Sequence, residues 1–217
     1  MRISHRYLDA CRRNPVAWTR RRLSSSTDEF IPIGYDGYTK LAIYAYHRTQ
    51  DRAFARQQLS TYLSRFSSID RIQEAEDVLD SYISWHDQER PIVVRTRFRI
   101  ILDIDHGNFL TGEVSRIDIC RDSGYRGILL GPIPLDWDSQ LRMPLIQLGL
   151  SQMYQRDPSE IEIGVQELDG SSISTRNYSD SEIGGAFEQV VRISKRVYEE
   201  VMQNVKGAWE KGTGLIN

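Results

Sequence analysis

Histidine, cysteine and lysine, which often perform catalysis, are few in this 217-residue chain, and their spacing matches no catalytic or metal-binding motif. The four histidines lie far apart, with no HExxH or zinc-finger spacing. The two cysteines, Cys11 and Cys120, are too few to frame a zinc or iron–sulfur site by themselves. No GxxxxGK[ST] or GxGxxG string indicates a nucleotide site. The sequence therefore predicts no resident cofactor or metal.

Arginine is the residue type whose distribution is most informative. Residues 1–65 contain 12 Lys and Arg against 5 Asp and Glu, whereas residues 66–217 contain 16 against 25. The densest part, residues 2–22, has seven arginines and only Asp9 opposing them. This run predicts a surface that faces phosphates, and the alternative is a solvated arginine-rich helix. The candidate nucleic-acid-binding residues here are Arg12, Arg13, Arg20, Arg21 and Arg22.

Lysine is rare, because the chain has four lysines against 24 arginines. None lies between residues 41 and 194. We therefore expect that residues 41–194 supply no lysine ammonium group to a catalytic site.

The elements that must position these residues begin with helices. Residues 3–23 predict a helix that Pro15 interrupts or restarts, residues 38–66 one or two more, and residues 69–86 another. A content of 40% apolar residues suits one compact α/β domain. Residues 1–90 are expected to form a helical region of that domain, and residues 91–217 its α/β core.

The core is predicted as three meandering strands, a helix, a strand and a helix. The first strand starts near residue 92, and its alternation places three arginines together on one exposed side. Strands at 109–120 and 125–130 follow, then a helix at 139–155 and a strand at 161–168. The string Ser179-x-x-Glu182 is a capping box that starts the last helix. The three arginines, also candidates for nucleic-acid binding, are Arg95, Arg97 and Arg99.

This order and several strings resemble the RecB-like branch of the PD-(D/E)XK nucleases. The strings are YLDACRRNPVAWTRRRL, LTGEVSRID, GYRGILLGPIP and QLRMPLIQLGLSQMYQRDPSEIEIGVQELDG. The resemblance implies a restriction-endonuclease-like fold, in which a central mixed sheet is flanked by helices. It also implies carboxylates on two adjacent strands that hold Mg²⁺ or Mn²⁺, with a lysine nearby.

This chain departs from the family at those catalytic positions. Ser115 stands where the first aspartate is implied, and Leu130 and Pro132 stand at the Asp/Glu-x-Lys positions. If the alignment slips by one, the latter pair becomes Gly131 and Ile133, which also lacks a carboxylate and a lysine. Gln140 matches the family's early helix glutamine. We therefore expect no catalytic residues; the relocated candidate is Glu113, which alternation places on the same strand face as Ser115.

Three hypotheses of function follow. The first is an inactive nuclease-like protein that binds nucleic acid, with DNA as the candidate, or acts as a scaffold with a protein partner in a DNA-processing or defence (CRISPR-like) complex. The second is an active nuclease that uses Mg²⁺ or Mn²⁺ at Glu113, and the third is a pure protein-interaction subunit. No stretch approaches the ~18 apolar residues of a membrane span, so the expected location is the cytoplasm.

Overall fold

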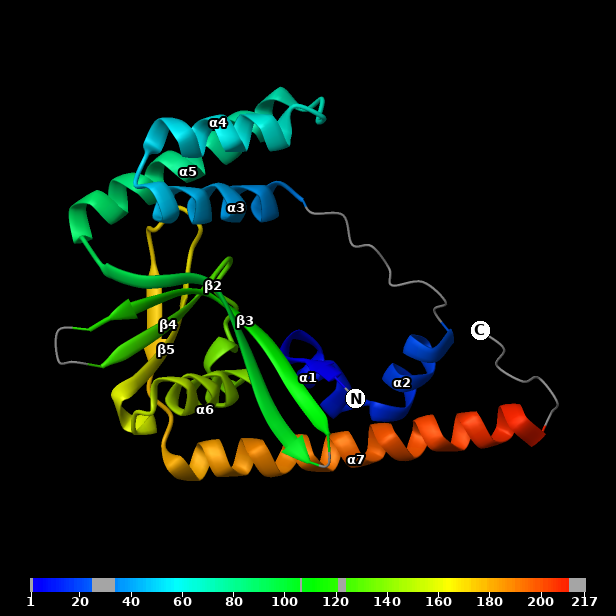
Figure 1. Cartoon of the computed structure of the whole chain (residues 1–217). Helices are drawn as coiled ribbons and strands as arrows, with labels where there is room; N and C mark the ends of the chain where they lie inside the picture. Colours follow the sequence, from blue (N-terminus) through cyan, green and yellow to red (C-terminus); the bar gives the residue numbers. More distant parts are fainter. Residues whose placement is uncertain (1, 25–33, 106, 121–123, 211–217) are drawn as a thin grey trace.

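The computed structural model describes residues 2–24, 34–105, 107–120 and 124–210 (Figure 1). Within these ranges, no helix is both long and apolar enough to cross a membrane. The α-helices are α1 (Leu8–Arg13), α2 (Pro15–Ser24), α3 (Tyr35–Thr49), α4 (Arg52–Leu63), α5 (Ile69–Glu89), α6 (Arg142–Tyr154) and α7 (Asp180–Glu210). The strands are β1 (Arg2–Ser4), β2 (Ile92–Asp105), β3 (Asn108–Ile119), β4 (Tyr125–Leu130), β5 (Ile161–Gln166) and β6 (Ile173–Arg176). The 3₁₀ helices are η1 (His5–Tyr7), η2 (Trp137–Ser139) and η3 (Pro158–Glu160).

One mixed sheet organises the fold. Strands β2, β3 and β4 form an antiparallel meander, α6 then crosses to β5, and β5 lies parallel to β4. Strand β6 returns antiparallel to β5, and β1 pairs parallel with the first half of β3. The predicted fold class, an α/β protein with a mixed sheet flanked by helices, is confirmed. The meander followed by a helical crossover to a parallel strand is the order that the nuclease resemblance implies.

Both faces of the sheet are buried under helices (Figure 1). Residues of α1, α6 and α7 form one apolar core with one face, as with Leu8, Leu150 and Val190. Residues of α3, α4 and α5 form a second core with the other face, to which β4 contributes Ile128 and Leu130. The sheet therefore separates two cores, and each core requires its own helical layer.

The N-terminal region differs from its prediction at its first residues. Residues 2–4 form β1, whereas the sequence predicts a helix from residue 3. Ile3 is fully buried where β1 pairs with β3. A strand of three residues is too short to show an alternating pattern in the sequence. A new helix, α2, does start at Pro15, as one of the two alternatives predicts. Residues 2–24 and residues 35–89 contribute to different cores, on opposite faces of the sheet.

The other elements lie close to their predicted ranges. The capping box of the last helix is confirmed, because the amide of Glu182 donates to Ser179 and the Glu182 carboxylate accepts from the Ser179 amide. Strand β6 was not predicted, since its four residues carry no apolar alternation. Most of the stretch between the helices predicted at residues 3–23 and 38–66, and residues 121–123 between two predicted strands, lie outside the described residues.

Candidate nucleic-acid interface

Two of the positions at which the resemblance implies metal-binding carboxylates lie side by side. The amide of Leu130 donates to the Ser115 hydroxyl at 3.0 Å. Both residues are buried, with exposed fractions of 7% for Ser115 and 4% for Leu130. Pro132, at the implied lysine position, is exposed just beyond the end of β4. A hydroxyl and an alkyl group therefore occupy the places where a hard cation would need anionic oxygens.

A lysine nevertheless reaches this end of β4, from helix α3. Gly131 has a φ of +144°, and a Cβ built on it would lie 3.2 Å from the Lys40 Nζ. Residues of α3 such as Tyr38 and Ala42 share an apolar core with Leu130, which holds the helix over the strand end. The stretch of residues 41–194 contains no lysine, and the fold instead brings Lys40 to this position from outside that stretch.

A buried carboxamide lies across from Leu130 on β5. Gln166 is fully buried, and neither its Oε1 nor its Nε2 has a hydrogen-bond partner in the described part of the chain. The neighbouring Glu167 is already engaged, because its Oε1 accepts from the Ile133 amide at 3.0 Å. Ligands in α/β folds usually bind at the carboxyl ends of parallel strands. At the ends of β4 and β5, the Gln166 amide has no partner among the described residues.

The relocated candidate, Glu113, lies in a different setting. It lines a pocket of about 380 Å³ together with His5 and Arg99, and its Oε2 is 3.5 Å from the Arg97 Nε. Across residues 2–24, 34–105, 107–120 and 124–210, no three His, Cys, Asp or Glu residues are arranged to hold a metal. The structure therefore gives Glu113 cationic neighbours and does not bring a second carboxylate to it.

Of the two cysteines, Cys11 is fully buried in the core formed with α6 and α7. Burial raises the pKa of the Cys11 thiol to about 12, so the thiol stays protonated at neutral pH. Its surroundings are those of a core side chain.

A groove of about 440 Å³ lies between α3, α4 and the first half of β2; we call it the basic groove. Arg48, Arg95 and Arg97 line it, and no aspartate or glutamate does. Tyr44 and Tyr62 supply two aromatic rings. The other lining residues are Leu41, Ala45, His47, Val93, Val94 and Thr96.

The arginines of the basic groove differ in how they are held. Arg48 and Arg95 form no ion pair within the described residues, and the Arg95 guanidinium lies 5.5 Å from the centre of the Phe98 ring. Arg97 approaches Glu113 and has a left-handed backbone with a φ of 51°. As predicted, the arginines of β2 are all exposed, but they serve two pockets: Arg95 and Arg97 line the basic groove and Arg99 lines the Glu113 pocket.

A buried polar network lies behind the basic groove. The Arg116 guanidinium is 1% exposed, forms two bonds of 2.7 and 2.8 Å with the Asp118 carboxylate, and donates to the Tyr82 hydroxyl at 2.5 Å. The Tyr82 hydroxyl lies 2.8 Å from the Nε2 of His47. Because arginine can only donate, the Tyr82 hydroxyl accepts from Arg116 and can donate its own proton to the His47 Nε2. This contact suits a neutral His47.

The charge of the basic groove accordingly comes from its arginines. Burial, the positive charge of Arg116 and the neighbouring His86 lower the pKa of His47 to about 3. At neutral pH this imidazole therefore adds no charge to the groove.

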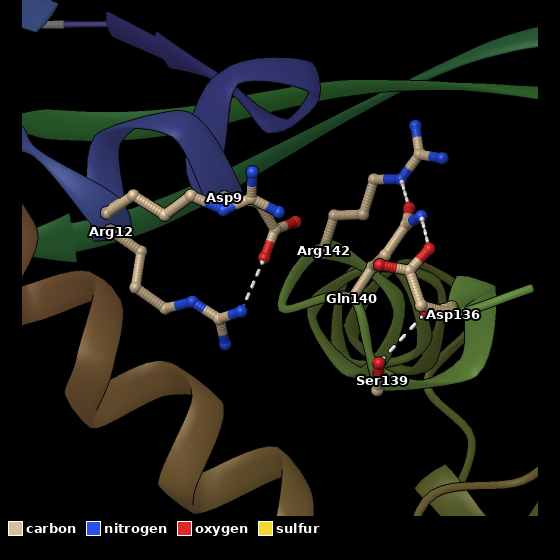
Figure 2. A pocket seen from close by; sticks show the side chains of 7 residues that line it. Asp9, Arg12, Asp136, Ser139, Gln140 and Arg142 are labelled. Carbon is tan, nitrogen blue, oxygen red and sulfur yellow. Dashed lines mark hydrogen bonds and ion pairs between the residues drawn. The ribbon is translucent and has the colours of Figure 1, made fainter. Parts of the chain in front are cut away.

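Among the first 22 residues, the arginines whose side chains are described, Arg12, Arg13 and Arg20, lie away from the basic groove. Arg12 pairs with Asp9 at 3.1 Å, and Arg20 pairs with Glu200 of α7 at 2.7 Å. Arg12 and Arg13 line a separate pocket that also includes Gln140 (Figure 2). Gln140 is therefore not beside Ser115, because it precedes α6 at the end of that helix facing α1. The side chains of Arg21 and Arg22 lie outside the described residues.

Three residues of the basic groove were not predicted from sequence. Tyr44 and Arg48 are four residues apart on α3 and so share one helix face, a signal that could have indicated their proximity. Tyr62 comes from α4, and nothing in the sequence links it to β2. The groove forms only when the helical layer packs over the sheet.

The chain shows low sequence and structural similarity to the known proteins with which it was compared. No protein-family model and no curated protein matches the chain. A candidate exonuclease from Eubacterium rectale is 10% identical, with 75% of this chain and 68% of that chain covered and a TM-score of 0.45. The structure of SSO0001 is 12% identical, covers 87% of this chain and 83% of that chain, and has a TM-score of 0.32. The fold is therefore described by its own sheet order: an antiparallel meander of three strands followed by a helical crossover to a parallel strand.

Proposed function

We propose that this protein binds nucleic acid in the basic groove and does not cut it. The observation that carries the proposal is a groove with three arginines, two tyrosines and no carboxylate. Guanidinium groups bind phosphates through paired N–H donors, and tyrosine rings stack against bases. An acidic peptide would use the arginines alone, whereas a nucleic-acid strand can use both the arginines and the tyrosine rings.

The shape and rings of the groove favour a single strand. In a duplex the base faces are stacked inside, so they cannot reach Tyr44 and Tyr62. An unpaired strand exposes both its phosphates and its base faces. A volume of about 440 Å³ suits a short stretch of such a strand.

Two observations support the absence of cutting. The implied metal positions are filled by Ser115 and Leu130, and Glu113 has Arg97 as its charged neighbour. We accordingly propose a nucleic-acid-binding subunit that works with a protein partner in a DNA-processing or defence complex. The partner would supply the chemistry that these positions lack.

Binding of a fluorescent single-stranded oligonucleotide, measured by anisotropy over a range of salt concentrations, tests the proposal. Three phosphate contacts predict a slope of about −2 for log affinity against log salt. The double variant Arg48→Ala/Arg95→Ala should weaken binding and bring the slope to about −0.7. Arg192→Ala, an exposed arginine of α7 paired only within its helix, is the control and should change neither quantity. No measurable binding, or no response to salt, would contradict the proposal.

The same oligonucleotide, incubated with Mg²⁺ or Mn²⁺, tests the second part. We expect the oligonucleotide to remain uncut with either metal. Metal-dependent cleavage that disappears in Glu113→Gln would instead support a nuclease with a relocated site.

A further inference from the structure

The basic groove runs along the open edge of β2. Within the described residues, β2 pairs with β3 alone, so its other edge is open there. Five consecutive residues of this strand, residues 93–97, line the groove. Because successive side chains of a strand point to opposite faces of its sheet, a hollow that meets all five lies against the main chain at the strand edge.

The burial pattern of β2 agrees with this position. In residues 99–104, exposed and buried residues alternate strictly, as in a strand with one covered face. None of residues 93–97 is buried. The first half of the strand is therefore accessible from its edge, where α3 and α4 supply the remaining lining residues of the groove.

The main chain at this edge has hydrogen-bonding groups to offer. In an antiparallel pair, every second residue directs both its N–H and its C=O away from the partner strand. Among the described residues, the groups of residues 93–97 that point away from β3 have no hydrogen-bond partner. A donor and an acceptor on one residue match the paired donor and acceptor on the edge of an unpaired base.

Two irregularities make this edge unsuited to pairing with a further peptide strand. The register with β3 shifts between Val93 and Arg95, so Val94 is an extra residue in β2. Arg97 has a left-handed backbone with a φ of 51°. A bulge and a left-handed residue interrupt the regular spacing that a β-ladder needs. The edge thus offers separate hydrogen-bonding groups in place of a template for another strand.

The side chains around the edge indicate which ligand approaches it. The same groove carries three arginines, the rings of Tyr44 and Tyr62, and no aspartate or glutamate. This charge suits the phosphates of a single strand, and the rings suit the faces of its bases. A base that stacks on a ring from α3 or α4 has its hydrogen-bonding edge left for another wall of the groove, and β2 is that wall.

We propose that the main chain of residues 93–97 hydrogen-bonds the edges of bases in a single strand bound in the basic groove. The inference rests on the proposed function, since it names the part of the same groove that reads the bases. The arginines then hold the phosphates, which carry no sequence information, and the edge of β2 determines which bases are accepted.

A short oligothymidylate and an analogue in which difluorotoluene replaces every thymine test this inference. The analogue keeps the phosphates and the ring shape but lacks the hydrogen-bonding edge. We expect the thymine form to bind about tenfold more tightly, as the loss of one or two hydrogen bonds implies. The slope of log affinity against log salt should be the same for both, because their phosphates are the same.

Matched variants separate the main chain from the side chains. Thr96→Val removes the one side-chain hydroxyl within residues 93–97 and should preserve the affinity ratio of the two oligonucleotides. Arg97→Ala and Arg48→Ala/Arg95→Ala should weaken binding of both by a similar factor and also preserve the ratio. A ratio that disappears in any of these variants would assign base readout to a side chain and overturn the inference.

Amide hydrogen exchange followed by NMR gives a site-resolved measurement on the wild-type protein. Amides of residues 93–97 that point away from β3 should exchange more slowly with saturating oligothymidylate than with the saturating analogue. Equal protection by both would show that the ligand only excludes water, which would overturn the inference.

The affinities also separate this inference from the proposed function. Equal affinity for the two oligonucleotides, with binding still dependent on the arginines, would overturn the base-readout inference and leave the proposed function standing. Failure of both to bind would overturn the proposed function, and the inference with it.

Discussion

Two fully buried glutamines should respond in opposite directions to the same substitution. Gln166 has no hydrogen-bond partner for either amide atom within the described residues, whereas the amide of Gln147 is completely engaged. Leucine is close to glutamine in size and has no polar atoms. We expect Gln166→Leu to stabilise the fold and Gln147→Leu to destabilise it.

The magnitudes follow from the bonds gained or lost. An unsatisfied buried polar group costs about 1–3 kcal/mol, so removing the Gln166 amide should raise the free energy of unfolding by about 1–2 kcal/mol. Gln147 donates to the carbonyls of Pro158 and Tyr178 at 2.9 Å each and accepts from the Tyr178 amide at 2.8 Å. At roughly 1 kcal/mol for each bond, Gln147→Leu should lower the free energy of unfolding by about 3 kcal/mol.

Thermal and urea unfolding of the two variants beside the wild type measure these changes. For a chain of this size, each kcal/mol moves Tm by about 2–4 °C. A loss of stability in Gln166→Leu comparable with that in Gln147→Leu would refute the reasoning. It would show that the Gln166 amide has a partner in solution, such as a bound water or a ligand at the carboxyl ends of β4 and β5.

Three further predictions concern the groove and the network behind it. Asp118→Ala leaves the Arg116 guanidinium buried without its carboxylate, so urea unfolding should show a free energy of unfolding lower by about 3–5 kcal/mol. The double variant Arg116→Met/Asp118→Leu should recover most of this loss. An Asp118→Ala variant within ~1 kcal/mol of the wild type would contradict the prediction. Glu113→Gln removes the negative charge beside Arg97 and should tighten oligonucleotide binding about two- to fivefold in anisotropy; weaker binding would contradict it. The pKa of His47 is about 3 in the folded state, below its unfolded value of about 6.5. The stability that the neutral His47 contributes is therefore fully present above about pH 6.5. It is lost as the pH falls toward 3, by up to about 1.4 kcal/mol per pH unit. Urea titrations between pH 4.5 and 7.5 measure this slope, and His47→Phe should flatten it. The groups facing His47 are Tyr82, Arg116 and His86, and an unchanged slope in the variant would assign the pH effect to another group.

The order of elements was predictable because most of them are long enough to show a period. The apolar spacing of α5 and the alternation of β2 each extend over many residues. Strand β1 has three residues and β6 has four, too few for a pattern to emerge. These short strands form because the edges of β3 and β5 are available to pair with them, which is a tertiary property.

The candidate site was predictable only in part, for a related reason. The arginines of β2 were identified from their alternation, and their exposure follows from it. Lys40, Tyr44 and Tyr62 come from helices that pack across the sheet, and no local pattern relates them to residues on β2 or β4. The buried pair of Arg116 and Asp118 was also missed, since charged residues in a strand predict an exposed face until a helix covers it.

The position of α3 over the end of β4 has a consequence for re-engineering. Introducing acidic residues at Ser115 and Leu130 would place two negative charges at positions only 7% and 4% exposed, with Leu130 beneath an apolar helical layer. Such charges would be desolvated without water or metal to compensate them, so the chain would lose stability before it gained a cation. Building a metal centre at these two positions would first require α3 to be moved away from the end of β4 or shortened. Catalytic competence in this fold thus depends on the helical cover as much as on the residues of the strands.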